Sequence, residues 1–343
     1  MKRIILAALA VCLLLSGCGR NTLEEPEQKQ YTATFLNLFD TVTTVVGRAE
    51  SKESFQAQAE EIRDNLEYYH QRFDIYHDYE GVANLKTVND QAGIGPVKVD
   101  QAVMELLLDC RRYYDLTGGK VNVTMGSVLS LWHEARADAL HAPQNAYLPD
   151  SQALRDAAAH TGISSLILDE EASTAYLSDP LASLDVGAIA KGWATERVAL
   201  SAPSGMLISV GGNVCATGPK KSDGTPWVIG IQDPDNSSEN VHTIYVSGGC
   251  VVTSGDYQRA YAVNGKRYHH IIDPETLMPA EYWRSVTVVC DDSGLADALS
   301  TALFLMPLEQ GRALAQECGA QVLWIDAAGE EFMTPGFEQM LRT

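Results

Sequence analysis

The spacing of apolar residues predicts a chain in which strands and helices alternate. Residues 31–49 alternate in polarity and are rich in Thr and Val, which predicts a strand pair or one long strand. Apolar residues at helical spacing then predict long amphipathic helices over 50–76 and 100–116, the second with Asp100 as its N-cap. The segment between these helices, 78–96, is rich in Gly and Asn and is predicted to be a loop.

The rest of the chain continues this mixed pattern. Helices are predicted over 124–135, 151–160, 187–200, 295–306 and 308–318, and strands over 164–168, 174–177, 206–210, 286–290 and 322–325. More strands are predicted around Trp227, Ile244 and Val251, and the dipeptide Asn264-Gly265 predicts a tight hairpin. Since strands joined by short turns pair antiparallel, we predict an α+β fold of mainly antiparallel sheets layered with helices.

The N-terminal segment follows a different pattern. Lys2 and Arg3 precede an apolar run, 4–15, which is shorter than the roughly 20 residues that a membrane-spanning helix needs. Small residues and Cys18 follow, and this order resembles the lipobox of bacterial lipoproteins; the alternative is an ordinary signal peptide with a chance cysteine. The resemblance implies an extracytoplasmic protein held at the cell membrane by lipid on Cys18, in three segments: a signal peptide (1–17), a tether (18–30) and a folded domain (31–343).

Composition narrows the classes of partner. The chain has 25 Lys and Arg against 45 Asp and Glu, a formal net charge of −20. An acidic surface repels phosphate backbones and gains nothing from counterion release, so nucleic acid is excluded as a polymer partner. With 45% hydrophobic and 20% charged residues, the composition is that of a globular protein and not of an acidic disordered chain.

Cysteine usage argues against a disulfide framework and against a thiolate zinc site. Cys12 and Cys18 belong to the N-terminal segment, and the other cysteines are odd in number, widely spaced and without a C-x-x-C pair. We expect them to be mainly small buried hydrophobic residues. One pair could still be oxidised outside the cytoplasm.

One candidate for ligand binding is the segment 183–192. Asp185 stands at a strand end and is followed by small residues at the start of a predicted helix, where backbone N–H groups can hold an anion. Asp185 could equally be no more than the helix cap. Lys191 lies one turn into the helix and could face either solvent or a ligand.

Further polar segments interrupt the apolar pattern. The Gly211-Gly212 pair is explained equally well by a tight turn, and residues 253–257 are predicted to be a polar segment between strands. A serine hydrolase triad is not favoured, because the nucleophile elbow G-x-S-x-G is missing. At the strand end His269-His270, alternate residues face opposite sides, so only one imidazole can face a given cleft.

A second candidate is a pair of oxygen ligands on one helix face. Asp297 and Thr301 are four residues apart in a predicted helix, so their side chains are neighbours. A carboxylate and a hydroxyl suit a hard cation such as Mg²⁺ and are poor ligands for zinc. This pair alone is a weak signal.

Taken in order, these segments resemble the ApbE-type FAD:protein FMN transferases. The motifs are Asp-x-Gly-Ala-Ile-Ala-Lys-Gly, Gly-Gly-Asn, Thr-Ser-Gly-Asp-Tyr, His-Ile-Ile-Asp-Pro and Ala-Asp-Ala-x-x-Thr-Ala, and the resemblance extends over about 34–328. It implies two sheet–helix halves that enclose a flavin-binding cleft. It also implies transfer of FMN from the substrate FAD to a threonine of an acceptor protein, such as a membrane or secreted redox subunit, with release of AMP.

The resemblance also assigns residues. It implies Mg²⁺ on the Ala188 carbonyl and on the side chains of Asp297 and Thr301, with His270 as the candidate for removing the threonine proton. It implies contacts with FAD at Phe39, Tyr76, Lys120, Val121, Asn122, Asp185, Lys191 and Ile271. Two alternatives use the same segments: a Mg²⁺-dependent FAD pyrophosphatase giving FMN and AMP, and an extracytoplasmic flavin-binding lipoprotein without catalytic activity.

The chain departs from the family pattern at two places. Residues 120–122 are Lys-Val-Asn where Ala-Phe-Asp is commoner, which leaves their side-chain roles open. Leu277 occupies a position where the family usually has glycine. Because leucine lacks glycine's access to positive φ, we expect this turn to differ in conformation.

Overall fold

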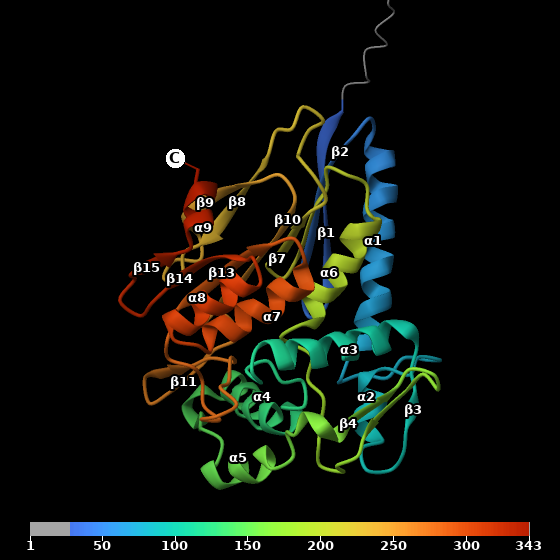
Figure 1. Ribbon diagram of the computed structural model, residues 1–343, viewed down its shortest axis with the longest axis vertical. Helices are drawn as coiled ribbons and strands as arrows, with labels where there is room; N and C mark the ends of the chain where they lie inside the picture. The colour runs from blue at the N-terminus through green and yellow to red at the C-terminus, as the bar shows by residue number, and fades with distance from the viewer. Residues whose placement is uncertain (1–27, 343) are drawn as a thin grey trace, which may run out of the picture.

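The computed structural model describes residues 28–342 (Figure 1). The predicted signal peptide, Cys18 and most of the predicted tether lie outside the described residues. Lys29 and Gln30, which we assigned to the tether, already form the start of strand β1, so the folded part begins slightly earlier than predicted. None of the described helices combines the length and the hydropathy of a membrane span.

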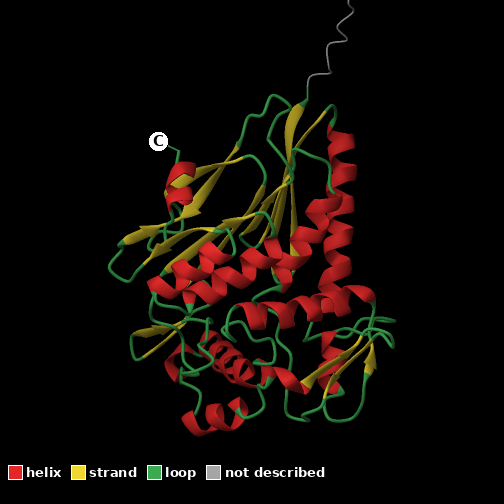
Figure 2. Cartoon of the chain, in the orientation of Figure 1, coloured by secondary structure: helices red, strands yellow, loops and turns green. Residues whose placement is uncertain are grey.

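A single antiparallel sheet forms the centre of the upper half of the molecule in Figures 1 and 2. The predicted strand pair over 31–49 is confirmed, with a bulge between Leu36 and Leu38. In spatial order the strands are β1 (Lys29–Leu38), β2 (Thr41–Ala49), β6 (Leu207–Val210), β7 (Asn213–Ala216), β10 (Gly249–Gly255), β13 (Ser285–Cys290), β14 (Gln321–Ile325) and β15 (Glu331–Met333).

The two faces of this sheet are covered by different layers. Alternate residues of a strand point to opposite faces, so Val252 and Val288 belong to one core while Val251 and Val289 belong to another. The first face packs against helices α1 (Lys52–Phe73), α6 (Ala190–Ser201), α7 (Ser293–Phe304) and α8 (Leu308–Glu317) (Figure 1). The second face packs against the hairpin β8 (Trp227–Gln232) and β9 (Asn240–Val246) and helix α9 (Pro335–Met340).

The lower half carries smaller elements (Figure 1). On one side are α2 (Leu85–Asp90), α3 (Gln101–Leu116) and the antiparallel sheet β3 (Val97–Lys98), β5 (Thr174–Leu177) and β4 (Leu166–Asp169). On the other are α4 (Gly126–His141), α5 (Ser151–Ala158) and the hairpin β11 (Tyr261–Val263) and β12 (Lys266–Tyr268), with short 3₁₀ turns at Pro143–Asn145 and Ile163–Ser165. The fold is therefore α+β and antiparallel, as predicted.

Several local predictions are wrong. The predicted loop 78–96 contains α2. The only sequence signal for this helix is the capping box between Asn84 and Thr87. Helix α6 begins at Ala190, not at 187, and Asp185 is not its cap: the Asp185 carboxylate accepts a hydrogen bond from the Gly187 N–H in a tight turn before the helix. Residues 253–255 lie within β10 and not between strands.

The backbone at Leu277 has a positive φ even though leucine reaches such values less easily than glycine. Leu277 adopts φ 61°, which lies in the left-handed region that favours glycine. The Leu277 N–H donates to the Asp273 carbonyl at 2.8 Å, and the Leu277 carbonyl accepts from the Trp132 indole at 3.0 Å. Two hydrogen bonds therefore hold the leucine in this conformation.

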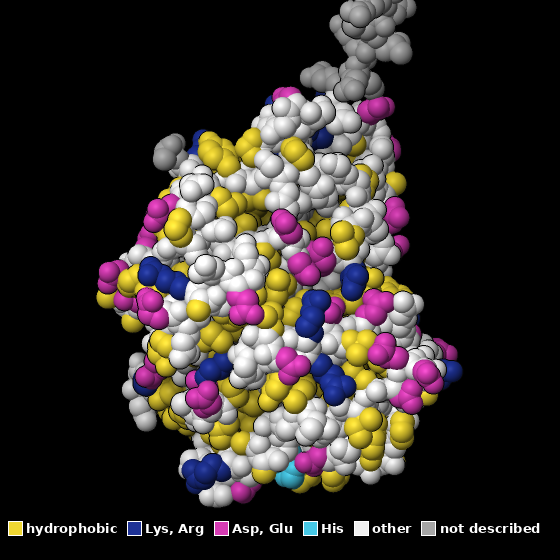
Figure 3. All heavy atoms as spheres, in the orientation of Figure 1, with side chains coloured by type: hydrophobic (Ala, Val, Ile, Leu, Met, Phe, Trp, Pro, Cys, Tyr) yellow, Lys and Arg dark blue, Asp and Glu magenta, His cyan; other side chains and the backbone are white. Residues whose placement is uncertain are grey.

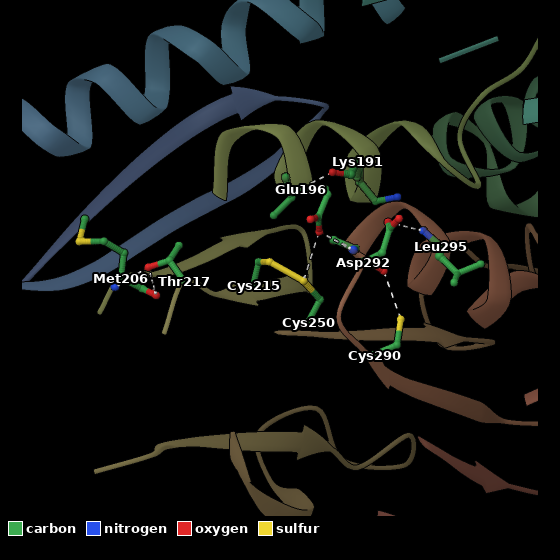
Figure 4. The surroundings of a disulfide bond; sticks show 11 residues. Lys191, Glu196, Met206, Cys215, Thr217, Cys250, Cys290, Asp292 and Leu295 are labelled. Carbon is green, nitrogen blue, oxygen red and sulfur yellow. Dashed lines mark hydrogen bonds between the residues drawn. A yellow bond between two sulfur atoms is a disulfide. The ribbon is translucent and has the colours of Figure 1, made fainter. Parts of the chain in front are cut away.

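A disulfide joins Cys215 on β7 to Cys250 on β10 (Figure 4). The two cysteines are direct partners on adjacent antiparallel strands, so this is the one oxidised pair that the sequence left open. Among the described residues, Cys110 is a buried free thiol, as expected of a small hydrophobic residue. Cys290 is also free, and its thiol donates to the Asp292 carbonyl at the start of α7.

Candidate functional site

A cavity of about 330 Å³ lies between the two halves and is lined by residues from both. It collects segments far apart in the sequence, from the β1–β2 turn to α7. Every described position that the resemblance assigned lies on its wall: Phe39, Tyr76, Lys120, Val121, Asn122, Asp185, Ala188, Lys191, His270, Ile271, Asp297 and Thr301. The two halves thus enclose a cleft, and the predicted site residues converge on it.

One wall is formed by the starts of α6 and α7, and we call it the α6–α7 wall. Asp297 is 4% exposed, and its carboxylate accepts a hydrogen bond from the Gly192 N–H at 2.8 Å. A Cβ at position 192 would collide with the Ser293 carbonyl and the Asp297 Cβ, so only glycine allows this close approach. Packing of the two helices thereby fixes Asp297.

The α6–α7 wall fits a hard cation. Asp297, Thr301 and Ala188 all line the same cavity, and together they offer carboxylate, hydroxyl and carbonyl oxygens. The Lys191 ammonium lies 3.6 Å from the Asp297 carboxylate and donates to the Gly187 carbonyl at 3.2 Å. A buried carboxylate needs a compensating positive charge, and this one lies beside further oxygen ligands.

A second wall is formed by the β1–β2 turn and the end of α1. Phe39 and Asp40 adopt φ of 51° and 53°, a conformation that costs free energy for residues other than glycine. The Phe39 N–H donates to His70 Nδ1 at 3.2 Å, and His70 Nε2 lies 3.3 Å from the Tyr79 hydroxyl. That hydroxyl donates to Asp74 at 2.8 Å, so a chain of hydrogen bonds holds the turn.

The Asp74 carboxylate also positions Tyr76, the second aromatic residue that the resemblance assigned to the site. Asp74 Oδ1 accepts from the Tyr76 N–H at 2.6 Å, while Oδ2 binds the Tyr79 hydroxyl. Tyr76 is 56% exposed, and its hydroxyl lies 3.2 Å from His133 Nδ1. We call Phe39, His70, Asp74, Tyr76 and Tyr79 the aromatic rim. Aromatic faces suit an isoalloxazine ring, so the rim could bind a flavin.

The three residues 120–122 reach the cavity in different ways. The Lys120 ammonium is paired with Glu275 at 2.8 Å, and Val121 is buried. The Asn122 amide donates to the Thr161 carbonyl at 2.8 Å and accepts from the Thr124 N–H at 3.0 Å. These hydrogen bonds hold the Asn122 side chain in place on the cavity wall.

The two adjacent histidines diverge, as predicted. His269 Nε2 lies 2.8 Å from the Ala280 carbonyl, and its ring packs edge-on against Phe304. His270 lines the cavity, and its Nδ1 is buried without a hydrogen-bond partner. Burial, followed by the charge of Arg259, lowers the pKa of His270 to about 3, so the imidazole is neutral and has an unoccupied ring nitrogen, but it is a weak base until the positive charges around it are offset.

Three basic residues near the cavity were missed by the sequence analysis. His133 and Arg259 line it, and Arg136 lies beside them. His133 and Arg136 are three residues apart on α4, a spacing that places both on one helix face next to Trp132. This spacing could have indicated His133 and Arg136 from the sequence. For Arg259 the only indication was its position just after the motif 253–257.

Comparison with known proteins gives a consistent result. The model of the ApbE family matches residues 39–324. A protein of Klebsiella pneumoniae named FAD:protein FMN transferase is 29% identical over 351 residues, which cover 98% of this chain and 96% of the relative. A Treponema pallidum protein with the same name is 33% identical over 260 residues, which cover 70% of each chain.

Solved structures are also similar. The ApbE protein of Thermotoga maritima superposes with a TM-score of 0.80 at 30% identity, over 92% of this chain and 100% of that one. The flavin transferase ApbE of Vibrio cholerae superposes with a TM-score of 0.74 at 26% identity, again over 92% and 100% of the two chains. The likeness therefore extends over both halves that enclose the cavity.

Proposed function

The chain belongs to the ApbE family, and we infer that it is an FAD:protein FMN transferase, an enzyme that moves flavin from FAD to an acceptor protein. The observation that carries this inference is the convergence of the aromatic rim, the oxygen ligands of the α6–α7 wall and a neutral His270 on one cavity. An aromatic surface, a place for a cation and a base are the three parts that the reaction needs.

We propose the following group transfer. The hydroxyl oxygen of a threonine on the acceptor attacks the phosphorus on the FMN side of the FAD pyrophosphate. A P–O bond to this oxygen forms, the bond to the bridging oxygen breaks, and AMP leaves. The threonine proton passes to a ring nitrogen of His270, which is available because the imidazole is neutral.

The chain's own residues have to offset the negative charge of the substrate. The protein carries a net charge of −20, so FAD, itself an anion, must be admitted by groups placed locally. Mg²⁺ held by Ala188, Asp297 and Thr301 would neutralise charge on the pyrophosphate when bound. Lys191 adds a positive charge beside Asp297.

Transfer can be tested by following where the flavin goes. Purified protein is incubated with FAD, MgCl₂ and a candidate acceptor, and the products are separated on a denaturing gel and by chromatography. Fluorescent flavin on the acceptor band is the expected result, lost with EDTA. Free FMN and AMP with no labelled acceptor would show a pyrophosphatase, and unchanged FAD would show a binding protein.

The role of His270 is tested with His270→Asn under single-turnover conditions. Loss of the proton acceptor is expected to slow transfer by about a hundredfold or more. His141→Asn is the matched control, since His141 is an exposed residue at the end of α4 and should leave the rate unchanged. A wild-type rate for the His270 variant would remove it from the mechanism.

We also propose that the protein is extracytoplasmic and anchored by lipid on Cys18, on the basis of the lipobox-like order of residues 2–18. One acyl chain gives only marginal membrane binding, so stable anchoring needs more than one chain. Incorporation of labelled fatty acid into the wild-type protein but not into Cys18→Ala is expected. Equal incorporation, or none in either protein, would contradict the anchor.

A further inference from the structure

Basic side chains around the cavity are mostly paired with carboxylates, as an acidic protein allows. Lys120 pairs with Asp273 and Glu275, and Lys191 with Asp297. Acidic side chains are also spread over the surface in view in Figure 3, among the apolar and basic ones. A basic residue near the site that lacks such a partner therefore requires an explanation.

Arg136 and Arg259 are two such residues. Within residues 28–342 neither guanidinium forms an ion pair or a side-chain hydrogen bond, and Arg136 Nε is buried without any partner. A buried donor without a partner costs free energy, which an arriving acceptor would recover. Arg259 also adopts φ 42°, a conformation that costs free energy in a non-glycine residue and is common at binding sites.

Both arginines line a side pocket of about 10 Å³, which has room for about one water molecule, so a bound phosphate group would have to lie in the adjoining main cavity. Arg136 projects from α4, and Arg259 comes from the segment after β10. His133, Arg259 and His270 line both this pocket and the main cavity, so the pocket adjoins the site at the proposed base. Trp132 and Tyr261 form apolar parts of its lining.

Several positively charged or protonatable side chains lie close together beside the cavity. Burial, followed by the charge of Arg259, lowers the pKa of Arg136. Burial also lowers the pKa of His133. Asp185 raises this pKa, whereas the charges of Arg136 and Arg259 lower it further. Asp185 lies 4.0 Å from His133 Nδ1, but it forms no ion pair with either arginine, so the positive charge of the two guanidinium groups is not paired within residues 28–342.

We propose that Arg136 and Arg259 form an anion site that binds a phosphate group next to His270. The planar guanidinium fork matches phosphate oxygens in pairs, so two guanidinium groups beside one cavity favour a phosphate over a chloride ion. The proposal rests on the proposed function for the source of the ligand: a phosphate of FAD or the phosphate of the departing AMP. The chemistry is the same for both.

A bound phosphate would also change how readily His270 accepts a proton. The charged groups that oppose protonation of His270 are Arg259, Lys191 and Arg136, together with the neighbouring His269. A phosphate held by the two arginines would offset their charge and strengthen His270 as a proton acceptor. Arrival of the substrate would in this way prepare the residue that accepts its proton.

The test measures binding, so it does not depend on turnover. Calorimetric affinities for FAD, AMP, inorganic pyrophosphate and riboflavin are compared between wild type, Arg136→Met and Arg259→Met. Loss of a charged hydrogen bond is expected to lower the affinity for the ligand whose phosphate occupies the site by roughly tenfold or more. Riboflavin, which has no phosphate, should bind equally well to all three proteins. Arg155→Met is the control, since Arg155 is exposed on α5.

Comparing the affinities for FAD and for AMP shows which phosphate occupies the site. A weaker affinity for FAD with unchanged AMP binding assigns the site to the FMN-side phosphate, and weaker binding of AMP assigns it to the leaving group. If a methionine variant fails to fold, Arg136→Lys and Arg259→Lys keep the charge but lose the fork, and a smaller loss of affinity is expected. Unchanged affinities for FAD, AMP and pyrophosphate in folded variants would overturn the proposal, whether or not the protein proves to be a transferase.

Discussion

The α6–α7 wall and the aromatic rim line the same cavity but are held by different forces. In the α6–α7 wall, Asp297 is buried and fixed by close helix packing through Gly192. In the aromatic rim, Tyr76 is largely exposed and Phe39 sits in an unfavourable backbone conformation held by His70. We infer that the position of a cation is set by packing, whereas the flavin-facing surface is set by hydrogen bonds and can adjust.

The largest expected effect is on Asp297. Asp297→Asn keeps the size of the side chain and an oxygen for the Gly192 N–H but removes the charge beside the pyrophosphate. Transfer is expected to fall by about 10²–10³-fold in single-turnover assays, as when one electrostatic group is removed from an active site. Asp64→Asn, at an exposed position on α1, is the control. A loss of less than tenfold would remove Asp297 from the cation site.

Removal of the disulfide tests whether the α6–α7 wall depends on it. Cys215 and Cys250 are 35 residues apart, and closing a loop of that length stabilises the fold by up to about 4 kcal/mol. Cys215→Ala/Cys250→Ala is therefore expected to lower the free energy of unfolding in urea by up to this amount. Transfer by the folded variant should stay near the wild-type rate, because Asp297 is fixed by its contact with Gly192. A folded but inactive variant would contradict the packing account.

Substitution of Gly192 tests packing directly. Gly192→Ala places a methyl group against the Ser293 carbonyl and Asp297, and overpacking of this kind costs about 1–3 kcal/mol of stability. The midpoint of thermal unfolding and the apparent affinity for Mg²⁺ are both expected to fall. Gly311→Ala in α8 is the matched control, since its Cβ would meet only ordinary contacts from 3.4 Å and alanine favours helix. Equal behaviour of the two variants would refute the role given to Gly192.

The smallest effect is expected at the aromatic rim. His70→Ala removes the acceptor of the Phe39 N–H, and loss of one hydrogen bond of about 1 kcal/mol should raise the KM for FAD about fivefold with little change in kcat. His70→Asn, which can restore an acceptor, should recover part of the loss, and Tyr79→Phe should lie between. Quenching of flavin fluorescence in the complex provides a second readout. A larger effect than that of Asp297→Asn would reverse the comparison between the two walls.

Sequence patterns located the long elements and the motif residues for a physical reason. The period of apolar residues is a local property, so α1, α3 and the β1–β2 pair could be predicted to within a few residues. Helix α2 and strand β15 are too short to show a period. The residues proposed as ligands were found through motifs, and the motifs include Ala188, whose proposed carbonyl role no side-chain pattern could indicate.

What could not be predicted is what tertiary packing brings together. His70 and Tyr79 carry no motif, and they gain a role only because the β1–β2 turn folds onto the end of α1. Arg136 and Arg259 come from segments 123 residues apart by their numbering and meet only in the fold. The positive φ of Leu277 was missed because the Trp132 hydrogen bond that supports it is also a long-range contact.

The central claim is that the cavity delivers FMN to a protein acceptor and not to water. The most direct measurement is the ratio of AMP released to flavin bound covalently to the acceptor in one reaction, with AMP measured by chromatography and the flavin by mass spectrometry of the intact acceptor. The account predicts a ratio close to one with the wild-type protein, and formation of both products slowed by about 10²–10³-fold with Asp297→Asn. AMP in large excess over labelled acceptor, or labelled acceptor formed by Asp297→Asn at the wild-type rate, would contradict it.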